Sequence, residues 1–277
     1  MLPIYYQTEN KDFTLLRGDC VELLNSFNFQ FDMIFADPPY HLSNGGISIQ
    51  NGRKVSVNKG NWDKSNGYEE DYLFDKTWIS SCRGKLKNNG TIWISGTYHN
   101  TFSIARCLTE LGFKILNCIV WEKTNPPPNL SCRYFTYSAE YILWARKECK
   151  VPHYFNYELM RTFNGGSQMR DIWRLPAISS WEKSFGKHPT QKPMNLLFRI
   201  IQASTMQGAW ILDPFTGSST TGIVANLLNR NFLGIDNCED FLRLSKDRRE
   251  ELNNKSVKVD YLDRVEKQAY LYRNNRF

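Results

Sequence analysis

The chain has 277 residues, of which 41% are hydrophobic, and a formal net charge of +7. This length is enough for one large α/β domain with a sizeable core, or for two small domains, and the charge favours a polyanion or an anionic surface as partner. Seven cysteines without a CxxC pair and four histidines without ligand spacing indicate reduced thiols and no structural metal. We find no signal peptide and no apolar run of membrane-spanning length, so we expect a cytoplasmic protein with no membrane partner.

The first predicted strand covers residues 13–17 and is followed by Gly18, Asp19 and Cys20 and by a helix at 21–26. An acidic side chain directly after a buried strand can bind the amino group of a ligand. The alternative is that Asp19 only caps the helix that follows it.

The second apolar run, at 33–36, stops at Asp37-Pro38-Pro39-Tyr40. Two consecutive prolines cannot donate hydrogen bonds to a neighbouring strand, so the strand must end there. In open α/β sheets, ligands bind at the carboxyl ends of the strands. The Asp37 carboxylate and the Pro38 carbonyl can accept the two N–H groups of an exocyclic base amine, while Tyr40 stacks on a base that has left the duplex. The alternative is an ordinary turn that Asp37 caps.

Residues 41–67 are too many for an ordinary connection, and they hold five glycines and four cations against one acid. We interpret them as a mobile loop that closes over DNA, with a basic surface loop of no function as the alternative. The candidate residues within it are Ser43, Asn44, Arg53, Lys54, Lys59 and Trp62.

The next stretch alternates between helices and strands. We predict a helix at 72–86 with Leu73, Trp78, Ile79 and Leu86 as core residues, a strand at 91–94, a helix at 100–111, and strands at 113–121 and 140–145. This alternation predicts a doubly wound, mostly parallel α/β sheet.

Two segments interrupt the alternation. The loop 123–138 contains three prolines, and its Arg133 and Tyr134 are candidates for phosphate contact and base stacking, or else pack the loop down. The segment 146–192 has nine cations against four anions, with aromatic residues between them, which favours a nucleic-acid surface over a solvated connector with core aromatics. Its candidate DNA contacts are Arg170, Arg174, Lys183 and Lys187, and Lys192 lies just before a helix at 194–204.

The last motif is a strand at 209–212, the turn DPFTGSSTTG at 213–222, and a second strand that ends at Asp236. Its small residues let the backbone approach a ligand at a helix N-terminus. The turn is not GxGxxG and has no P-loop lysine, so a nucleoside with an amino-acid arm fits better than a pyrophosphate. We expect Asp213 to bind an ammonium, Phe215 an adenine ring and Asp236 a ribose. A purely structural turn is the alternative.

Taken in order, LLRGDCVELL, IFADPPY, GKHPTQKP, DPFTGSSTTG and FLGID resemble the β group of amino DNA methyltransferases (DPPY type), over roughly residues 11–254. The stretches FADPPYHLSNGGIS, VNKGNWDK and KTNPPPNLSCRYFT are similar to the second adenine methyltransferase of DpnII-type restriction–modification systems. The resemblance implies a Rossmann-like methyltransferase fold with an inserted DNA-recognition segment. It also implies S-adenosylmethionine as cofactor, DNA as partner, and N6 of a flipped adenine in GATC as acceptor, with a homodimer as a family expectation.

Site residues follow from the same resemblance. Asp37, Pro38, Pro39 and Tyr40 are implied to hold and stack the adenine. The residues implied to surround the cofactor are Asp19, Cys20, Asp37, Lys192, Asp213, Phe215, Gly217, Ser218, Thr220 and Asp236. Ser219 stands where the family turn FxGSGTT has its second glycine, which would cost about 1–2 kcal/mol if that position needs a positive φ.

We divide the chain into a catalytic half (1–145), a target-recognition segment (146–192), a cofactor-binding half of the same domain (193–254) and a C-terminal tail (255–277) that has no functional interpretation. Three alternatives stay open. They are N4-cytosine transfer by the same site, a catalytically idle DNA-binding module, and a nicotinamide dehydrogenase, which the turn sequence disfavours. The sequence does not distinguish single-stranded from double-stranded DNA.

Overall fold

The computed structural model describes residues 2–40, 47–50, 53–56, 63–126, 128–186 and 188–271. The strands are β1 (Ile4–Gln7), β2 (Phe13–Arg17), β3 (Phe31–Ala36), β4 (Ile47–Gln50), β5 (Arg53–Ser56), β6 (Leu86–Gly96), β7 (Lys114–Lys123), β8 (Ala139–Arg146), β9 (Ile172–Leu175), β10 (Trp210–Asp213) and β11 (Asn231–Asp236). The helices are α1 (Cys20–Asn25), α2 (Tyr68–Lys85), α3 (Thr101–Glu110), α4 (Tyr157–Phe163), the 3-10 helix η2 (Ser180–Lys183), α5 (Met194–Ser204), α6 (Thr220–Leu227), α7 (Glu239–Glu251) and α8 (Lys255–Leu271).

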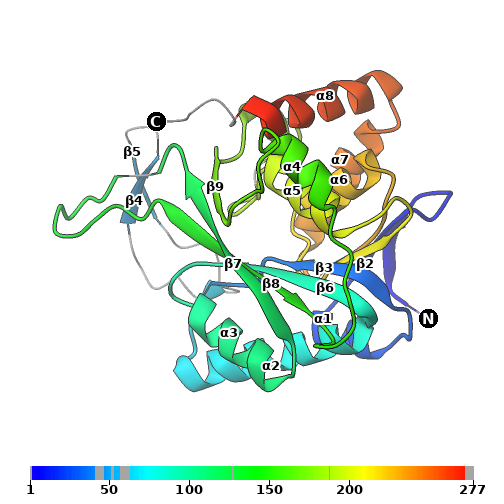
Figure 1. The fold of residues 1–277 in the computed structure, drawn as a ribbon, viewed down its shortest axis with the longest axis horizontal. Coiled ribbons are helices and arrows are strands. Elements are labelled where there is room, and N and C mark those ends of the chain that lie inside the picture. The colour runs from blue at the N-terminus through cyan, green and yellow to red at the C-terminus, as the bar shows by residue number, and fades with distance from the viewer. Residues whose placement is uncertain are drawn as a thin grey trace.

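A nine-stranded sheet in the order β1-β2-β11-β10-β3-β6-β8-β7-β9 runs through the molecule, with helices on both faces (Figure 1). The strands β2, β11, β10, β3 and β6 pair in parallel. Their carboxyl ends therefore meet at one edge of the sheet, as the predicted doubly wound fold requires. The prediction of a mostly parallel α/β sheet is confirmed. Within the described residues, β4 and β5 form a separate antiparallel pair.

One predicted strand, β8, runs against this direction. β8 pairs antiparallel with both β6 and β7, and the loop 124–138 joins β7 to β8 directly. An antiparallel pair needs no crossover helix, which is why no helix lies between these two strands. As a consequence, β8 begins at the edge where the parallel strands end.

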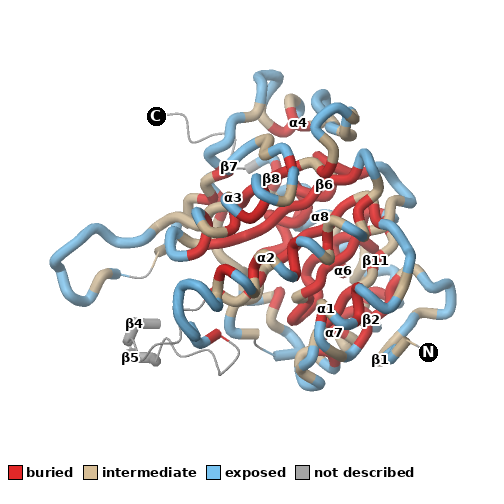
Figure 2. Tube along the Cα trace, turned by 90° about the horizontal axis from the view of Figure 1, so that it is seen from below, coloured by how far each residue is buried: buried red, intermediate tan, exposed pale blue. Residues whose placement is uncertain are grey.

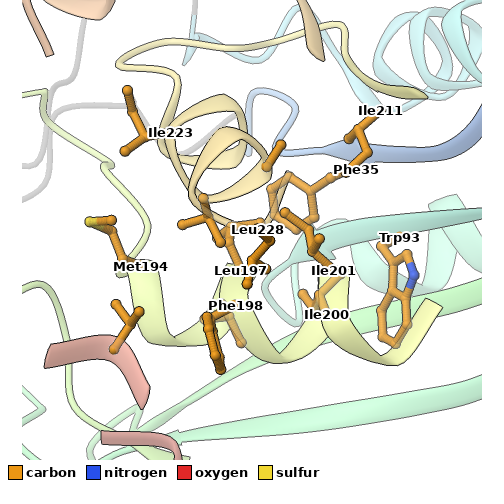
Figure 3. Close-up of a cluster of buried hydrophobic side chains, with 14 of the residues drawn as sticks. Phe35, Trp93, Met194, Leu197, Phe198, Ile200, Ile201, Ile211, Ile223 and Leu228 are labelled. Carbon is orange, nitrogen blue, oxygen red and sulfur yellow. The ribbon is translucent and has the colours of Figure 1, made fainter. Parts of the chain in front are cut away.

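The helix α5 explains how the sheet is covered on one face. Its apolar side chains Leu197 and Ile201 point to the sheet strands that carry Phe35 and Trp93 (Figure 3), while Phe198 packs against Phe163 of α4, with ring centroids 6.0 Å apart. α5 is buried on almost all sides because the helix α8 packs on its outer surface through Val265 and Ala269, within the same core. The C-terminal tail of the sequence-based division is therefore a helix of the main core up to residue 271.

Two details of the predicted core differ from the structure. α2 begins at residue 68, and this places Leu73 on its outer face, where it is 58% exposed, while Tyr72, Trp78 and Ile79 are buried. The prediction of Leu73 as a core residue was therefore wrong. In the basic segment, Phe163 and Trp173 are each 5% exposed and belong to the main core (Figure 2 shows the buried interior in red).

Candidate active site

A cavity of about 300 Å³ lies at the carboxyl ends of β2, β3, β10 and β11. It is lined by residues from six separate stretches of the sequence: Gly18, Asp19, Cys20, Phe35, Asp37, Pro39, Phe74, His188, Thr190, Gln191, Lys192, Asp213, Pro214, Phe215, Thr216, Gly217, Ser218, Thr220, Thr221, Ile235, Asp236 and Asn237. All ten predicted cofactor-binding residues are among them. Of the four predicted catalytic residues, Asp37 and Pro39 line the cavity, and Pro38 is buried behind it.

Asp37 lies directly after β3 at the centre of a buried ion-pair network. The Lys192 ammonium donates to both carboxylate oxygens, at 2.8 Å to Oδ1 and 2.7 Å to Oδ2. The hydroxyls of Tyr40 (2.6 Å) and Ser95 also donate to Oδ1. Burial alone would raise the pKa of Asp37, but Lys192 and these donors bring it below its ordinary value, so the carboxylate is ionised at neutral pH.

Lys192 has a second acid beside it. Its Nζ atom lies 3.6 Å from Oε2 of Glu140, at the start of β8, and Lys123 donates to the other oxygen of Glu140. Burial opposes the charge of Lys192, but Asp37 and Glu140 together raise the pKa of this ammonium above its ordinary value. The pKa of Glu140 is lowered, since the attraction of Lys192 and Lys123 outweighs the effect of burial. The cluster thus holds two anions and two cations.

Hydrogen bonds from both the side chain and the backbone hold Tyr40 in place. Its hydroxyl donates to Asp37, and its backbone N–H donates to Oδ1 of Asp63 at 2.8 Å. The side chain is 5% exposed, and the Lys192 Nζ atom lies 5.1 Å from the ring centroid. The ring is buried in this arrangement, so the predicted stacking on a base stays a prediction and would require the residues that cover the ring to move.

The turn after β10 is organised by the two predicted carboxylates. Asp213 accepts from the Thr221 hydroxyl (2.6 Å) and the Phe215 N–H (3.1 Å), and burial raises its pKa to about 7. Asp236 accepts one backbone N–H on each oxygen, from Gly217 and from Cys238, both at 2.8 Å. Burial also raises the pKa of Asp236. Asp236, the last residue of β11, thus holds the backbone of the turn 213–222 at Gly217.

Asp19 caps α1, accepting the N–H groups of Val21 (2.9 Å) and Glu22 (3.0 Å), while its side chain also faces the cavity. The capping role expected as the alternative is confirmed, and a role in ligand binding stays a prediction. The neighbouring Cys20 is buried, and burial raises the pKa of its thiol to about 12. This thiol is therefore protonated at neutral pH.

An aromatic wall and a close contact shape the rest of the cavity. The Phe215 ring packs edge-on against Trp78, with ring centroids 5.2 Å apart. Gly217 has a φ of +49°, and a Cβ atom at this position would lie 2.9 Å from Nε2 of His188. His188, from the GKHPTQKP stretch, packs edge-on against Phe241. The glycine therefore lets the turn and the His188 loop approach each other.

Ser219 adopts a φ of +52° and a ψ of +36°, so the position does require a left-handed backbone. It is fully buried, and its hydroxyl lies 2.8 Å from that of Thr216. The serine therefore carries the backbone strain expected for a side chain at a positive φ, and its hydrogen bond to Thr216 offsets part of that cost.

We expect the variant Ser219→Gly to be more stable than Ser219→Ala by about 1 kcal/mol. Both variants lose the hydroxyl and its bond to Thr216, and only alanine keeps a Cβ atom at a positive φ. Urea unfolding of the two variants measures the difference. Equal free energies of unfolding would mean that the left-handed backbone is not strained.

Several functional residues were missed by the sequence analysis. Ser95 and Glu140 contact the Asp37–Lys192 pair, and His188 contacts the turn. In the sequence, Glu140 is only a charged residue at the start of an apolar strand. Because β8 runs antiparallel to its neighbours, the start of this strand lies beside Asp37, which the sequence does not reveal.

The predicted DNA contacts are spread over the surface. Arg133, Tyr134, Arg170 and Arg174 are exposed, and Lys183 is half-buried. Ser43, Asn44, Lys59, Trp62 and Lys187 lie outside the described residues, and for Arg53 and Lys54 only the backbone of β5 is described. In the described part of the chain, no group of acids, histidines and cysteines is arranged to bind a metal, and no helix is long and apolar enough to cross a membrane.

Comparison with known proteins decides the family. The family model described as DNA methylase matches residues 31–247, which include β3, the segment 146–192 and the turn 213–222. The chain belongs to the DNA methylase family. Type II methyltransferase M2.MboI of Moraxella bovis is 54% identical over 265 residues, covering 95% of this chain and 97% of the relative. M2.DpnII of Streptococcus pneumoniae is 53% identical over 250 residues, covering 90% and 93%.

Solved structures agree with this assignment. The crystal structure of the M1.HpyAVI–SAM complex matches with a TM-score of 0.66 and 28% identity, covering 85% of this chain and 98% of that one. The PvuII DNA methyltransferase (cytosine-N4-specific) matches with a TM-score of 0.72 at 18% identity, over 96% of both chains, and supports the fold alone. The predicted class, an S-adenosylmethionine-dependent DNA methyltransferase, is thereby confirmed.

The cavity of this DNA methylase fits S-adenosylmethionine. Four carboxylates line it, from Asp19, Asp37, Asp213 and Asp236, and they match the ammonium and hydroxyl donors of that molecule. The Phe215 ring offers an apolar surface for a purine. The volume of about 300 Å³ is at the lower end of the range for small-molecule sites.

Proposed function

We propose that this chain is a site-specific DNA-adenine methyltransferase of a restriction–modification system, which methylates N6 of a flipped adenine in GATC. The observation that carries the proposal is that the ionised Asp37 carboxylate and the turn 213–222 line one cavity. A base amine bound at Asp37 therefore lies beside a ligand held by the turn. Similarity to the second methyltransferases of DpnII-type systems supports adenine and GATC.

S-adenosylmethionine supplies an electrophilic methyl group on a positively charged sulfur. The residues of the chain position the acceptor for it. Asp37 accepts one N–H of N6 and the Pro38 carbonyl accepts the other, which directs the nitrogen lone pair away from them and stabilises the positive charge that develops on N6. The Cys20 thiol is protonated and takes no part as a nucleophile. The methyl group would pass directly to N6 without a covalent enzyme intermediate. Its bond to sulfur would break as the bond to N6 forms, S-adenosylhomocysteine would leave, and N6 would lose one proton to solvent.

The cofactor contacts that we assign follow the cavity wall. Asp213, with a raised pKa and a buried carboxylate, receives the ammonium of the amino-acid arm. Asp236 uses one lone pair on each oxygen for the turn and keeps the others for ribose hydroxyls. Phe215 packs against the adenine of the cofactor.

The segment 146–192 and the loop 124–138 are the proposed DNA contacts. The loop projects from the body of the molecule in both views (Figures 1 and 2), and its Tyr134 and Phe135 are 59% and 96% exposed. It begins after Lys123 and ends before Glu140, beside the Asp37 network. Exposed rings at this edge can stack on bases, and Arg133 and the other cations of the segment can contact phosphates.

The double variant Tyr134→Ala/Phe135→Ala should bind a GATC duplex at least about 30-fold more weakly, because each of the two stacked bases is worth about 1–3 kcal/mol. The readout is the dissociation constant from fluorescence anisotropy. Met206→Ala is the matched control, since Met206 is 60% exposed but precedes β10, at the opposite edge of the sheet. Equal affinities of the double variant and this control would remove the loop from the DNA interface.

The function itself is tested by transfer of labelled methyl groups to a GATC duplex and to a duplex with the site scrambled, followed by nucleoside analysis. We expect N6-methyladenine in the GATC duplex alone. N4-methylcytosine would overturn the acceptor, and equal label in both duplexes would overturn the site. Bound S-adenosylmethionine with no label in double- or single-stranded DNA would identify an idle binding module.

A further inference from the structure

The network around Asp37 contains one hydrogen-bond acceptor with no donor. Among the described residues, Oε2 of Glu140 is buried and has no hydrogen-bond partner, while Lys123 donates to the other oxygen. The nearest cation is Lys192, whose Nζ atom is 3.6 Å away. A buried carboxylate oxygen without a donor is costly, so its presence next to an ammonium calls for an explanation.

Asp37, in contrast, already accepts as many hydrogen bonds as its carboxylate has lone-pair positions. Oδ1 accepts from Tyr40, Ser95 and Lys192, and Oδ2 accepts from Lys192. A carboxylate offers about four lone-pair positions in all. The proposed function requires one of them for the N6 amino group, and Lys192 occupies the side of the carboxylate on which Oδ2 lies.

Lys192 cannot release Asp37 by moving into water, because its side chain is 7% exposed. A buried ammonium needs another anion when it leaves the first. Glu140 is that anion, and the 3.6 Å separation needs to shorten by only about 0.8 Å to reach the length of an ordinary charged hydrogen bond.

We propose that Glu140 is a positioning residue that takes the Lys192 ammonium from Asp37 when the target adenine docks. Asp37 Oδ2 then accepts an N–H of N6, and Glu140 Oε2 gains the donor that it lacks. No proton changes hands, the number of charges stays constant, and each hydrogen bond that breaks is replaced. This inference rests on the proposed function.

The test compares two duplexes that differ at the target base, one with adenine and one with purine, which lacks the 6-amino group. Dissociation constants are measured in the presence of S-adenosylhomocysteine, so no methyl transfer takes place. We expect the unaltered enzyme to prefer adenine about tenfold, and Glu140→Gln to reduce this preference to about twofold or less, because a neutral amide cannot take the ammonium from Asp37.

Glu148→Gln is the matched control. Glu148 follows the other end of β8, pairs with Arg83 and carries the same charge, so its replacement should leave the preference for adenine unchanged. Glu140→Asp keeps the buried charge but withdraws it by one methylene group, and it should give an intermediate preference. If Glu140→Gln does not fold, the preference measured for Glu140→Asp still tests the role of Glu140.

A full preference for adenine in both Glu140 variants would overturn the role of Glu140. A lack of preference in the unaltered enzyme would instead contradict the contact between Asp37 and the amino group, which belongs to the proposed function. The two failures are therefore distinguishable.

Discussion

Replacement of Asp37 with asparagine should lower the single-turnover rate of methyl transfer by about 100- to 1,000-fold, which is typical for loss of one electrostatic contact to the reacting atom. The amide removes the negative charge that stabilises the developing charge on N6. It also removes one of the two acids that neutralise Lys192. Rapid-quench measurement with saturating GATC duplex and labelled S-adenosylmethionine gives the rate of the chemical step.

The affinity for a GATC duplex should fall by no more than about tenfold in the same variant, because in the proposed function Asp37 contacts a single amino group of the DNA. Asp240→Asn, on the exposed face of α7, provides a control with the same change in net charge. Thermal unfolding should establish that both variants are folded. A rate for Asp37→Asn within tenfold of the control would contradict the assignment of Asp37 as the residue that holds the amino group.

Gly217→Val should abolish measurable binding of S-adenosylmethionine, with a loss of at least about 100-fold, equivalent to about 2.8 kcal/mol. The position has a φ of +49°, which a β-branched residue adopts only with strain. The added Cβ atom would also lie 2.9 Å from His188 Nε2, at the wall of the cavity. Isothermal titration calorimetry measures the affinity.

A suitable control is Gly166→Val. Gly166 also has a positive φ, of +85°, but nothing lies within 4 Å of a Cβ atom at that position. The control carries the backbone strain without the clash and should bind the cofactor normally. If both variants bind equally well, the approach of the turn to the His188 loop is not needed for the cofactor.

The sequence was most informative where a motif follows a parallel strand. The residues after β2, β3, β10 and β11 could be assigned to one site because the carboxyl ends of neighbouring parallel strands must meet. The family resemblance implied that Asp19, Asp37, Asp213 and Asp236 lie together, and the parallel pairing of the four strands explains why they line one cavity.

The same reasoning could not find Glu140. Strand direction is set by pairing with neighbours far away in the sequence, and the antiparallel course of β8 leaves no local signal. Tyr40 illustrates a second limit, because the motif indicates an aromatic ring near the site but not whether the ring is covered. Whether Trp173 and Phe163 face the core or the solvent was likewise decided by tertiary packing, since basic segments with aromatic residues occur in both settings.

The packing of α8 has a consequence for exchanging sequence specificity between relatives. Tyr261 of α8 lies against Trp181 of η2, with ring centroids 5.0 Å apart, and Tyr270 lies against Phe163 of α4 at 5.2 Å. The segment proposed to read DNA is thus anchored on a helix whose contacting residues lie 80 and 107 positions further along the chain. A chimaera that received only residues 146–192 from a relative would pair aromatic rings from two different proteins at these two contacts. A chimaera that also receives α8 from the same relative should keep both ring contacts and should be expressed as a folded protein.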